Sequence, residues 1–344
     1  MRPLHYAVIE ITNRCNLRCP HCASTSGNPR ENELSLTEIS DLLTEIKALG
    51  GKEITIIGGE ALLHPDWFEI CSRVRTLGME LILISNGLPI TRETTLPLLK
   101  ELKPRVIGLS LDGATRESYK KHRGVDKFHH IMDLLRALRD DGHKNVNAIT
   151  TFMRSNIGEF DAFVELFSGS QITWQVQLAN VGGERFDDTG VITPEQFAWF
   201  VSKMKTALKT PRLRLQHMDD FGYCPLDPEL AFLHETWHSC LAGRSLVGVR
   251  SDGDINGCLS LGDAFIEANL REHSLTEIWS SGEWFKELRS KETLLSGTCA
   301  TCPHGPICQA GCTSIAYSTT GTIGENPYCI RTLETTELLN HFTK

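Results

Sequence analysis

Three cysteines near the start of the chain, Cys15, Cys19 and Cys22, form a Cys-x3-Cys-x2-Cys pattern. Cysteine thiolates are the usual ligands of iron–sulfur clusters, and a 4Fe–4S cluster normally takes four of them. Three cysteines at this spacing leave one iron without a protein ligand. Because an open iron can bind a substrate or cofactor, the pattern predicts a cluster that takes part in chemistry.

A second group of cysteines lies in the C-terminal part of the chain. Its members are Cys240, Cys258, Cys299, Cys302, Cys308, Cys312 and Cys329. The chain starts without a secretory signal pattern, so we expect a cytoplasmic protein, in which disulfides are rare. The spacings therefore favour iron–sulfur or metal ligation. Zinc sites are the alternative for this group, and buried thiols or an incomplete zinc site are the alternative for the first.

The N-terminal half alternates strand-like and helical patterns that could position these cysteines. The strand-like runs cover residues 5–11, 53–57, 80–85, 105–111, 145–151 and 172–178. Amphipathic stretches separate them, and one begins with a capping box of Ser35 and Glu38. This alternation predicts a parallel sheet with right-handed crossovers. In such sheets sites lie at the carboxyl ends of the strands, and the first cysteine loop follows the first strand.

Composition and charge exclude several classes of partner. The chain has 344 residues and a formal net charge of −8, and no basic stripe is visible. Such a surface does not attract phosphate backbones or anionic lipids, so we expect no nucleic-acid and no membrane partner. The apolar runs are also far too short to cross a bilayer.

The first cysteine loop resembles that of the radical S-adenosylmethionine (SAM) enzymes, which have three cysteines after the first strand of a partial (β/α)6 barrel. The resemblance implies that the open iron binds the amino and carboxylate groups of SAM. It also implies that the reduced cluster cleaves SAM to methionine and a 5′-deoxyadenosyl radical, which abstracts hydrogen from an unactivated carbon. The protein then supplies orientation and a dry site.

Gly58-Gly59-Glu60 resembles the radical SAM motif whose backbone holds the methionine end of SAM. It follows the second predicted strand, as the motif does in the family. Relatives commonly have proline next, and Ala61 stands there in this chain.

Four further residues match positions that contact SAM in the family. Ser110 resembles a serine that meets the ribose or carboxylate of SAM, and Arg123 resembles an arginine that pairs with the carboxylate. A planar guanidinium suits that role because its fork matches a carboxylate. Ser85 and Leu178 lie at strand ends that face SAM in relatives. A surface arginine and a core leucine are the alternatives for Arg123 and Leu178.

The C-terminal cysteines resemble the SPASM extension of radical SAM enzymes, whose seven motif cysteines are all present. By resemblance, an outer auxiliary cluster is held by Cys299, Cys302, Cys308 and Cys329. An inner auxiliary cluster is held by Cys240, Cys258 and Cys312. The resemblance therefore implies three 4Fe–4S clusters, one that binds SAM and two auxiliary ones.

The inner set is one ligand short. In some relatives a cysteine a few residues after the first supplies the fourth ligand, and residues 241–249 contain none. Cys224 is the nearby candidate, so either it completes the inner set or that cluster has an open iron. A plain buried thiol is the alternative for Cys224 and the expected role of Cys71.

These patterns divide the chain into three parts. Residues 1–206 form the expected α/β unit, a partial (β/α)6 TIM barrel of the radical SAM type, and residues 240–344 form the cysteine-rich SPASM domain. Residues 207–239 bridge them, with an irregular pattern over 209–238. This bridge contains the candidates for catalysis or substrate handling, His217, Asp219, Asp220 and Tyr223. A solvated linker would explain these polar residues equally well.

SPASM-type relatives mostly modify peptides or proteins, so the first hypothesis is a radical SAM maturase that abstracts hydrogen from a peptide or protein. The second is a dehydrogenase or tailoring enzyme on a small metabolite, of the aminocyclitol or haem-precursor type. The third is a non-enzymatic iron–sulfur or zinc protein. Formylglycine formation is not expected, because Leu259 stands where the resembling sulfatase maturases carry aspartate.

The position of the first cysteine loop bears on the expected partners. The loop begins at residue 15, so we expect no fused leader-binding domain. A peptide substrate would then need a separate leader-binding protein or direct docking. Reduction of the cluster requires an electron donor such as flavodoxin or ferredoxin.

Overall fold

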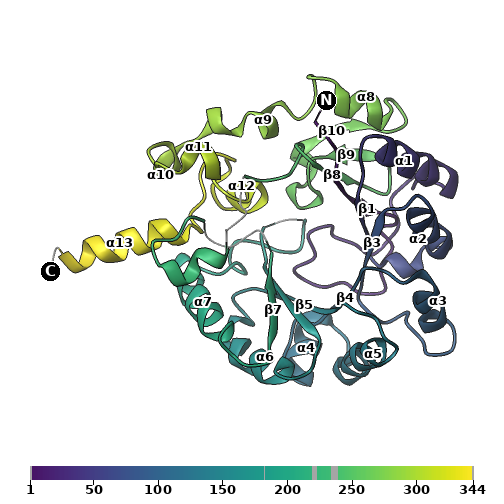
Figure 1. Cartoon of the computed structure of the whole chain (residues 1–344), viewed down its shortest axis with the longest axis horizontal. Helices are drawn as coiled ribbons and strands as arrows, with labels where there is room; N and C mark the ends of the chain where they lie inside the picture. Colours follow the sequence, from purple (N-terminus) through teal and green to yellow (C-terminus); the bar gives the residue numbers. More distant parts are fainter. Residues whose placement is uncertain (1, 182, 219–222, 234–238, 343–344) are drawn as a thin grey trace.

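A single sheet of ten strands organises the chain, in the order β10-β9-β8-β1-β2-β3-β4-β5-β6-β7. The computed structural model describes all residues except 1, 182, 219–222, 234–238 and 343–344. Figure 1 shows the central strands curving around the middle of the molecule, with helices α1 to α7 outside them. The strands that the sequence predicts are β1 (Tyr6–Glu10), β2 (Glu53–Ile57), β3 (Glu80–Ser85), β4 (Val106–Ser110), β5 (Val146–Phe152) and β6 (Thr173–Leu178). All of these pair in parallel, as expected.

Helices connect these strands and cover the outer face of the sheet. They are α1 (Leu36–Ala48), α2 (Trp67–Thr76), α3 (Thr95–Leu102), α4 (Arg116–Arg123), α5 (Phe128–Asp140), α6 (Phe160–Phe167) and α7 (Pro194–Ala207). The predicted capping box of α1 is formed, since the Ser35 side chain accepts the Glu38 backbone N–H and the Glu38 side chain accepts the Ser35 N–H. Short 3-10 turns lie at Ala61–Leu63 and Ile157–Glu159.

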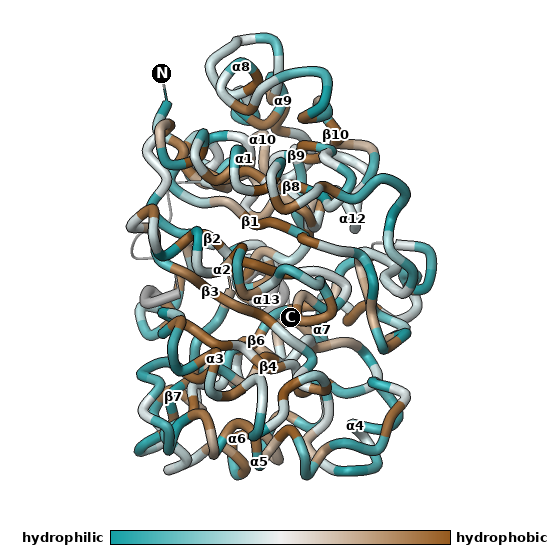
Figure 2. The backbone as a smooth tube through the Cα atoms, turned by 90° about the vertical axis from the view of Figure 1, so that its right-hand side faces the viewer, coloured by the Kyte–Doolittle hydropathy of each residue, from teal (hydrophilic) through white to brown (hydrophobic). Residues whose placement is uncertain are grey.

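The alternation of side chains along the strands explains how the core forms. In β2, Ile54 and Ile56 are fully buried, whereas Thr55 between them is half-buried. One side of each strand therefore packs under the helices. Figure 2 shows that β1 and β3 consist largely of hydrophobic residues. An aromatic cluster closes the core below α6 and α7, where Phe152 lies 4.8 Å from Phe200 between ring centroids. Each such pair adds about 0.5–1.5 kcal/mol beyond the burial itself.

The bridging segment is more regular than expected. Residues 214–217 form β7 (Arg214–His217), which pairs in parallel with β6, and a 3-10 turn covers Pro228–Leu233. Four residues are too few for a periodic pattern to stand out in the sequence, so pairing with β6 determines this strand. The expectation of an irregular segment over residues 209–238 was therefore wrong in this part.

The C-terminal region continues the barrel sheet. Strand β8 (Leu246–Val249) pairs in parallel with β1, and β9 (Asp254–Asn256) and β10 (Ile266–Asn269) extend the sheet in antiparallel pairs. Strands β8 and β9 thus form a hairpin around residues 250–253. The sheet crosses the expected boundary near residue 240, because the free edge of β1 provides backbone hydrogen bonds for β8.

The remaining C-terminal elements are short helices. They are α8 (Leu275–Ser280), α9 (Lys286–Arg289), α10 (Gly297–Ala300), α11 (Gly305–Cys308), α12 (Thr313–Thr320) and α13 (Ile330–Phe342), with 3-10 turns at Leu259–Leu261, Asp263–Phe265 and Lys291–Leu294. In Figure 1, α13 extends away from the barrel. Over the described residues, the helices lack the length and apolarity that crossing a membrane requires.

Candidate active site

The first cysteine loop leaves the carboxyl end of β1 and is closed by its own backbone. The Cys15 N–H donates to the Gly27 carbonyl at 3.0 Å, and the Gly27 N–H donates to the Asn13 carbonyl at 3.1 Å. Burial raises the pKa of the Cys15 thiol to about 11; the Leu17 N–H opposes this effect, and the charges of Glu60, Cys19 and Cys22 add to it. The three thiols are thus brought together. With its raised pKa the Cys15 thiol is neutral at pH 7, and cluster iron would convert it to a thiolate.

Gly58 and Gly59 pack directly against this loop. The Gly59 N–H donates to the Thr12 carbonyl at 2.7 Å, and the Glu60 N–H donates to the Arg14 carbonyl at 2.8 Å. A Cβ on Gly59 would lie 2.4 Å from the Asn13 carbonyl oxygen, which leaves no room for a side chain. The motif therefore supports the cysteine loop, a role that the resemblance did not reveal.

Replacing Gly59 by alanine is expected to displace the loop, because the clashing atoms belong to the backbone and cannot rotate away. We expect a loss of about 1–3 kcal/mol of stability and loss of iron from the N-terminal site. Denaturant unfolding and iron analysis would measure both. Gly158→Ala is the matched control, since nothing lies within 4 Å of its Cβ position. Equal unfolding midpoints and iron contents in the two variants would contradict the expectation.

The Glu60 carboxylate joins the ends of β2 and β3 and is 1% exposed. It accepts the Ser85 hydroxyl at 2.8 Å and the Asn86 N–H at 2.6 Å. The Asn86 amide donates to Asn16 Oδ1 at 2.7 Å and lies 3.8 Å from Cys15 Sγ. Ser85 is therefore part of the scaffold, and Asn86 is a supporting residue that sequence analysis missed. Its signal was its position directly after the predicted strand.

Arg123 is buried beside the cysteine loop, so the alternative of a surface arginine was wrong. Its side chain is 11% exposed, and its Nε lies 2.8 Å from Asp112 Oδ2. Its Nη1 donates to Cys19 Sγ at 3.3 Å. The guanidinium is thus fixed at the end of α4, within hydrogen-bond distance of Cys19 Sγ.

Asp112 is the second supporting residue that sequence analysis missed. It is fully buried, its Oδ2 lies 3.0 Å from His21 Nε2, and its Oδ1 accepts the Thr151 N–H at 2.8 Å. Burial raises the pKa of this carboxyl, but Arg123 and His21 outweigh it and hold the pKa well below its usual range. The carboxylate is therefore charged at neutral pH and ties α4 to the cysteine loop.

The other predicted SAM contacts lie at the same edge of the sheet. Ser110 is half-buried at the end of β4, and Leu178 is 5% exposed at the end of β6. Leu178 packs in the hydrophobic core, as its alternative role required. Contact of either residue with SAM remains a prediction.

The outer cysteine set is brought together by α10, α11 and the start of α13. Burial raises the pKa of Cys308 to about 12, and the charges of Cys329, Cys224 and Cys299 raise it as well. Burial raises the pKa of the Cys299 thiol too, and the charges of Cys329 and Cys302 add to this shift. These side chains are close enough to feel one another, as the ligands of one cluster must be.

Cys224 lies beside the outer set. Burial raises its pKa, and the neighbouring thiols that add to this shift are Cys329 and Cys302. Its backbone carbonyl accepts Arg331 Nη1 at 3.2 Å. The expectation that Cys224 completes the inner set gains no support from this position.

Tyr223 does not line the mouth of the barrel. It is 1% exposed, and its hydroxyl accepts the Cys312 N–H at 2.7 Å. A Cβ on Gly311 would lie 1.8 Å from its ring, so the ring packs directly on that glycine. Tyr223 therefore anchors an expected inner ligand rather than a substrate.

The remaining candidates of the bridge are less informative. His217 is half-buried at the end of β7, with Nδ1 2.9 Å from the Met218 carbonyl oxygen. Asp219 and Asp220 lie outside the described residues. Cys71 is fully buried in α2, in agreement with a core role.

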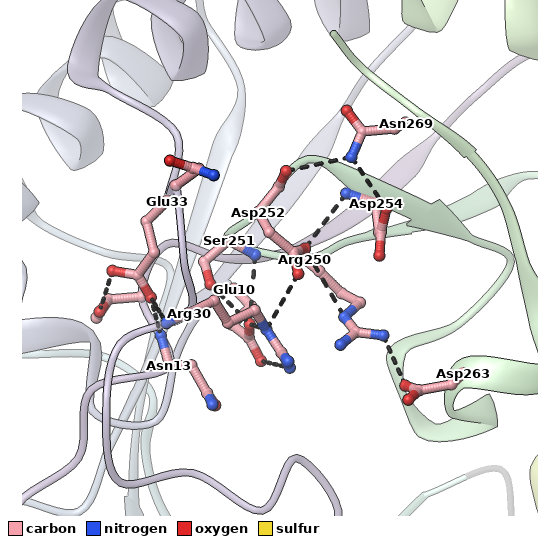
Figure 3. A network of polar contacts seen from close by, with 12 residues as sticks. Glu10, Asn13, Arg30, Glu33, Arg250, Ser251, Asp252, Asp254, Asp263 and Asn269 are labelled. Carbon is pink, nitrogen blue, oxygen red and sulfur yellow. Dashed lines mark hydrogen bonds and ion pairs between the residues drawn. The ribbon is translucent and has the colours of Figure 1, made fainter. Parts of the chain in front are cut away.

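A polar network joins the cysteine loop to the β8–β9 hairpin. Glu10, 2% exposed at the end of β1, accepts Arg30 Nε at 2.7 Å and the Ser251 hydroxyl at 3.0 Å. Figure 3 shows Glu10 between these groups, with Arg250 beyond them paired to Asp263 at 2.6 Å. The network links the barrel with the C-terminal region.

A cavity of about 390 Å³ opens beside this network. Its walls include Ala23 to Thr25, which directly follow Cys22, and Leu259, which directly follows Cys258. A larger cavity of about 520 Å³ lies between α3 and α5, and its lining includes no neighbour of a cysteine in the sequence. The smaller cavity is lined by sequence neighbours of Cys22 and Cys258, so it lies next to both cysteine regions.

The cysteine sets fit iron–sulfur clusters better than single ions. In the described part of the chain, no group of three or more His, Cys, Asp or Glu side chains is close enough to hold one metal ion. A cubane cluster spaces its thiolates around a cage of irons, so its ligands do not meet at one point. The buried, mutually interacting thiols match that donor chemistry.

Comparisons with known proteins agree with this site. The Radical SAM superfamily model matches residues 9–167, and the SPASM iron–sulfur cluster-binding domain model matches residues 240–303. The mycofactocin maturase MftC of Mycobacterium tuberculosis strain H37Rv is 27% identical over 331 residues, with 94% of this chain and 82% of the relative covered. The AdoMet-dependent heme synthase of Methanosarcina barkeri is 30% identical over 340 residues, with 93% and 95% covered.

Solved structures show the same fold. SuiB of Streptococcus suis bound to the precursor peptide SuiA matches with a TM-score of 0.73 at 17% identity, over 96% of this chain and 76% of that one. Native anSMEcpe with bound AdoMet and the Cp18Cys peptide matches with a TM-score of 0.74 at 18% identity, over 97% and 96%. The expected fold class is thus confirmed. The chain belongs to the radical SAM superfamily and carries a C-terminal SPASM iron–sulfur cluster-binding domain.

Proposed function

We propose that this enzyme cleaves SAM reductively and abstracts hydrogen from a peptide or protein substrate during its post-translational modification. The observation that carries this proposal is the cavity that adjoins both the first cysteine loop and Leu259, next to Cys258. A substrate bound there would lie beside the expected SAM-binding cluster and the inner auxiliary set. Family membership makes the chain an enzyme, so the non-enzymatic hypothesis is set aside.

The residues around the loop have distinct proposed tasks. Cys15, Cys19 and Cys22 would hold a cluster with one open iron, and SAM bound there would supply the radical. Arg123 is oriented by Asp112 toward the cluster loop and would bind the SAM carboxylate. The amides of the Gly-Gly-Glu motif hold the loop in place. The buried surroundings exclude water, which protects a reactive radical from side reactions.

The lining of the cavity favours a peptide over a flat apolar metabolite. Its walls are mostly polar, with side chains such as Ser24, Glu184 and Asn256, and few apolar groups such as Leu259. A peptide presents donors and acceptors along its backbone that such walls can pair. The maturase relative MftC agrees with this substrate class.

A haem precursor is the second candidate substrate. It is favoured by the heme synthase relative, which is 30% identical and is covered over 95% of its length. A haem precursor differs from most peptides in carrying several carboxylates. The cavity walls include Arg30 and Arg250, which could bind carboxylates. Both guanidinium groups are paired with acidic side chains, Arg30 with Glu10 and Arg250 with Asp263.

The decisive experiment offers both substrate classes to the anaerobically reconstituted enzyme with SAM and dithionite. Peptides encoded by short reading frames beside the gene form one arm, and an iron coproporphyrin forms the other. We expect a mass change in one of the peptides. When that peptide is labelled with deuterium, we expect deuterium to be transferred into 5′-deoxyadenosine. Turnover of the porphyrin alone would favour the second candidate. If no 5′-deoxyadenosine forms with either the peptides or the porphyrin, both candidate functions would be contradicted.

Replacing Leu259 by tryptophan is expected to fill part of the cavity. The ratio of substrate-coupled to uncoupled deoxyadenosine should fall by about tenfold to hundredfold, because small misplacements of reacting atoms have effects of this size. Leu208→Trp, at a side chain 39% exposed beyond α7, is the matched control. An unchanged ratio in Leu259→Trp would show that substrate does not use this cavity. A separate leader-binding protein and a flavodoxin or ferredoxin donor remain predictions, to be tested by adding each to the reaction.

A further inference from the structure

Lys291 is a buried lysine among the C-terminal cysteines. It begins the 3-10 turn Lys291–Leu294 and is 1% exposed. Its Nζ donates to the Gly311 carbonyl at 3.0 Å and to Thr313 Oγ1 at 3.1 Å. Among the ion pairs formed between described residues, none includes Lys291. Lysine is almost never fully buried unless its charge is compensated, so this position needs an explanation.

The charges near Lys291 come from both cysteine sets. Burial lowers the pKa of its ammonium, and four cysteines oppose this effect, namely Cys240, Cys312, Cys308 and Cys299. The first two belong to the expected inner set and the last two to the expected outer set. The ammonium is therefore within electrostatic reach of both sets.

The hydrogen bonds of Lys291 also place it close to one particular ligand. Gly311 and Thr313 flank Cys312, the N-cap residue of α12. Lys291 thus holds the backbone on both sides of that cysteine, while the Tyr223 hydroxyl accepts the Cys312 N–H. Rotation of the ammonium away from the cysteines would break both of its hydrogen bonds in a buried site, which is costly.

A bound iron–sulfur cluster would supply a negative partner for the Lys291 ammonium. A cluster with thiolate ligands carries net negative charge, and each added electron makes it more negative. A fixed cation nearby stabilises the reduced form more than the oxidised form, so it raises the reduction potential. Hydrogen bonding and charge around cluster sulfurs are recognised determinants of that potential.

We propose that Lys291 is a buried cation shared by the two auxiliary clusters, where it compensates their charge and raises their reduction potential. Reduced auxiliary clusters are then favoured, which suits clusters that accept an electron from a substrate radical. Lys291 is a positioning and tuning residue, since it acts through the clusters. The inference rests on the proposed pair of auxiliary clusters.

The test uses the full chain with Cys15, Cys19 and Cys22 replaced by alanine, so that iron is bound only by the auxiliary sites. In this background Lys291→Met removes the charge and keeps the length of the side chain. We expect unchanged iron and sulfide content. In an EPR-monitored redox titration, the ratio of reduced to oxidised cluster at a fixed potential should fall about tenfold, equivalent to a 59 mV more negative midpoint for a one-electron couple.

Two further variants separate charge from folding. Lys291→Arg keeps the charge and is expected to retain the parent midpoint, whereas Lys291→Gln keeps hydrogen-bonding capacity without charge and should behave like Lys291→Met. Lys286→Met is the matched control, because Lys286 lies on the neighbouring α9 with its side chain 63% exposed. If both uncharged variants lose iron while Lys291→Arg retains it, the need for a cation is supported directly.

The opposite results would overturn the proposal. Lys291→Met or Lys291→Gln with full iron content and the parent midpoint would show that the charge has no effect on the clusters. Loss of iron in all three Lys291 variants would show that a lysine-specific packing role replaces the electrostatic one. A parent with no auxiliary iron would remove the basis of the inference. It would leave the proposed SAM cleavage testable by deoxyadenosine formation in the wild-type enzyme.

Discussion

Replacing Cys15, Cys19 and Cys22 together by alanine is expected to abolish formation of 5′-deoxyadenosine while iron remains at the C-terminal sites. The thiols expected to hold the SAM-binding cluster lie in one loop, closed by the Cys15–Gly27 backbone hydrogen bond, and share no described contact with the outer set. Loss of the cluster removes the source of the electron, so the decrease should reach the detection limit of the assay. Deoxyadenosine and iron per chain are the two measurements.

Cys71→Ala is the control for this triple variant. Cys71 is also a buried thiol, and burial raises its pKa to about 12. It lies on α2, away from the cysteine loop. Its removal should cost about 1 kcal/mol of stability and leave deoxyadenosine formation intact. Cleavage of SAM by the triple variant would overturn the assignment of the open cluster.

Asp112→Ala is expected to destabilise the apoprotein by about 3–5 kcal/mol, because it leaves the buried Arg123 guanidinium without its carboxylate. The two side chains are 0% and 11% exposed, so solvent screens this pair little. The substitution also removes the partners of His21 Nε2 and the Thr151 N–H. Urea unfolding under reducing conditions would measure the change in the free energy of unfolding.

The same substitution is expected to weaken SAM binding to the reconstituted enzyme. Without Asp112, neither Arg123 nor the His21 part of the cysteine loop is held in orientation, and such supporting residues affect affinity by about tenfold to hundredfold. Asp133→Ala removes an exposed partner of Arg136 and should change stability by about 0.5 kcal/mol or less. If Asp112→Ala and Asp133→Ala had the same free energy of unfolding and the same SAM affinity, Asp112 would not be the residue that orients Arg123 and His21.

Local patterns in the sequence predicted much of the fold. The six central strands appear within about one residue of their expected limits. Strands β2, β3 and β6 alternate buried with more exposed side chains, whereas β4 and β5 are short, almost continuously buried runs. The capping residue Ser35 marks the start of α1, because capping is a contact between residues three apart. Strand β7 was missed because its four residues depend on pairing with β6.

Cysteine spacing had the same local character. Cys15, Cys19 and Cys22 lie within one turn-rich loop, so their order along the chain already implied that they meet. Membership of the radical SAM superfamily confirmed that interpretation. The residue types and their spacing therefore indicated an iron–sulfur cluster with one open iron, and the resemblance to the radical SAM enzymes identified SAM as the molecule expected to bind there.

Contacts between distant parts of the chain were decided by the tertiary structure. His21 meets Asp112 across 91 residues, and Tyr223 meets Cys312 across 89. Cys224 lies with the outer cysteines although Cys240 is nearer in sequence, and Lys291 lies between both sets. No periodicity records such pairs, because they arise when parallel strands bring their carboxyl ends to one edge and the C-terminal segment folds back over it. Local sequence patterns thus indicated the iron–sulfur chemistry and the six central parallel strands. Burial and long-range pairing decided where the other strands join the sheet and which side chains support the cysteines.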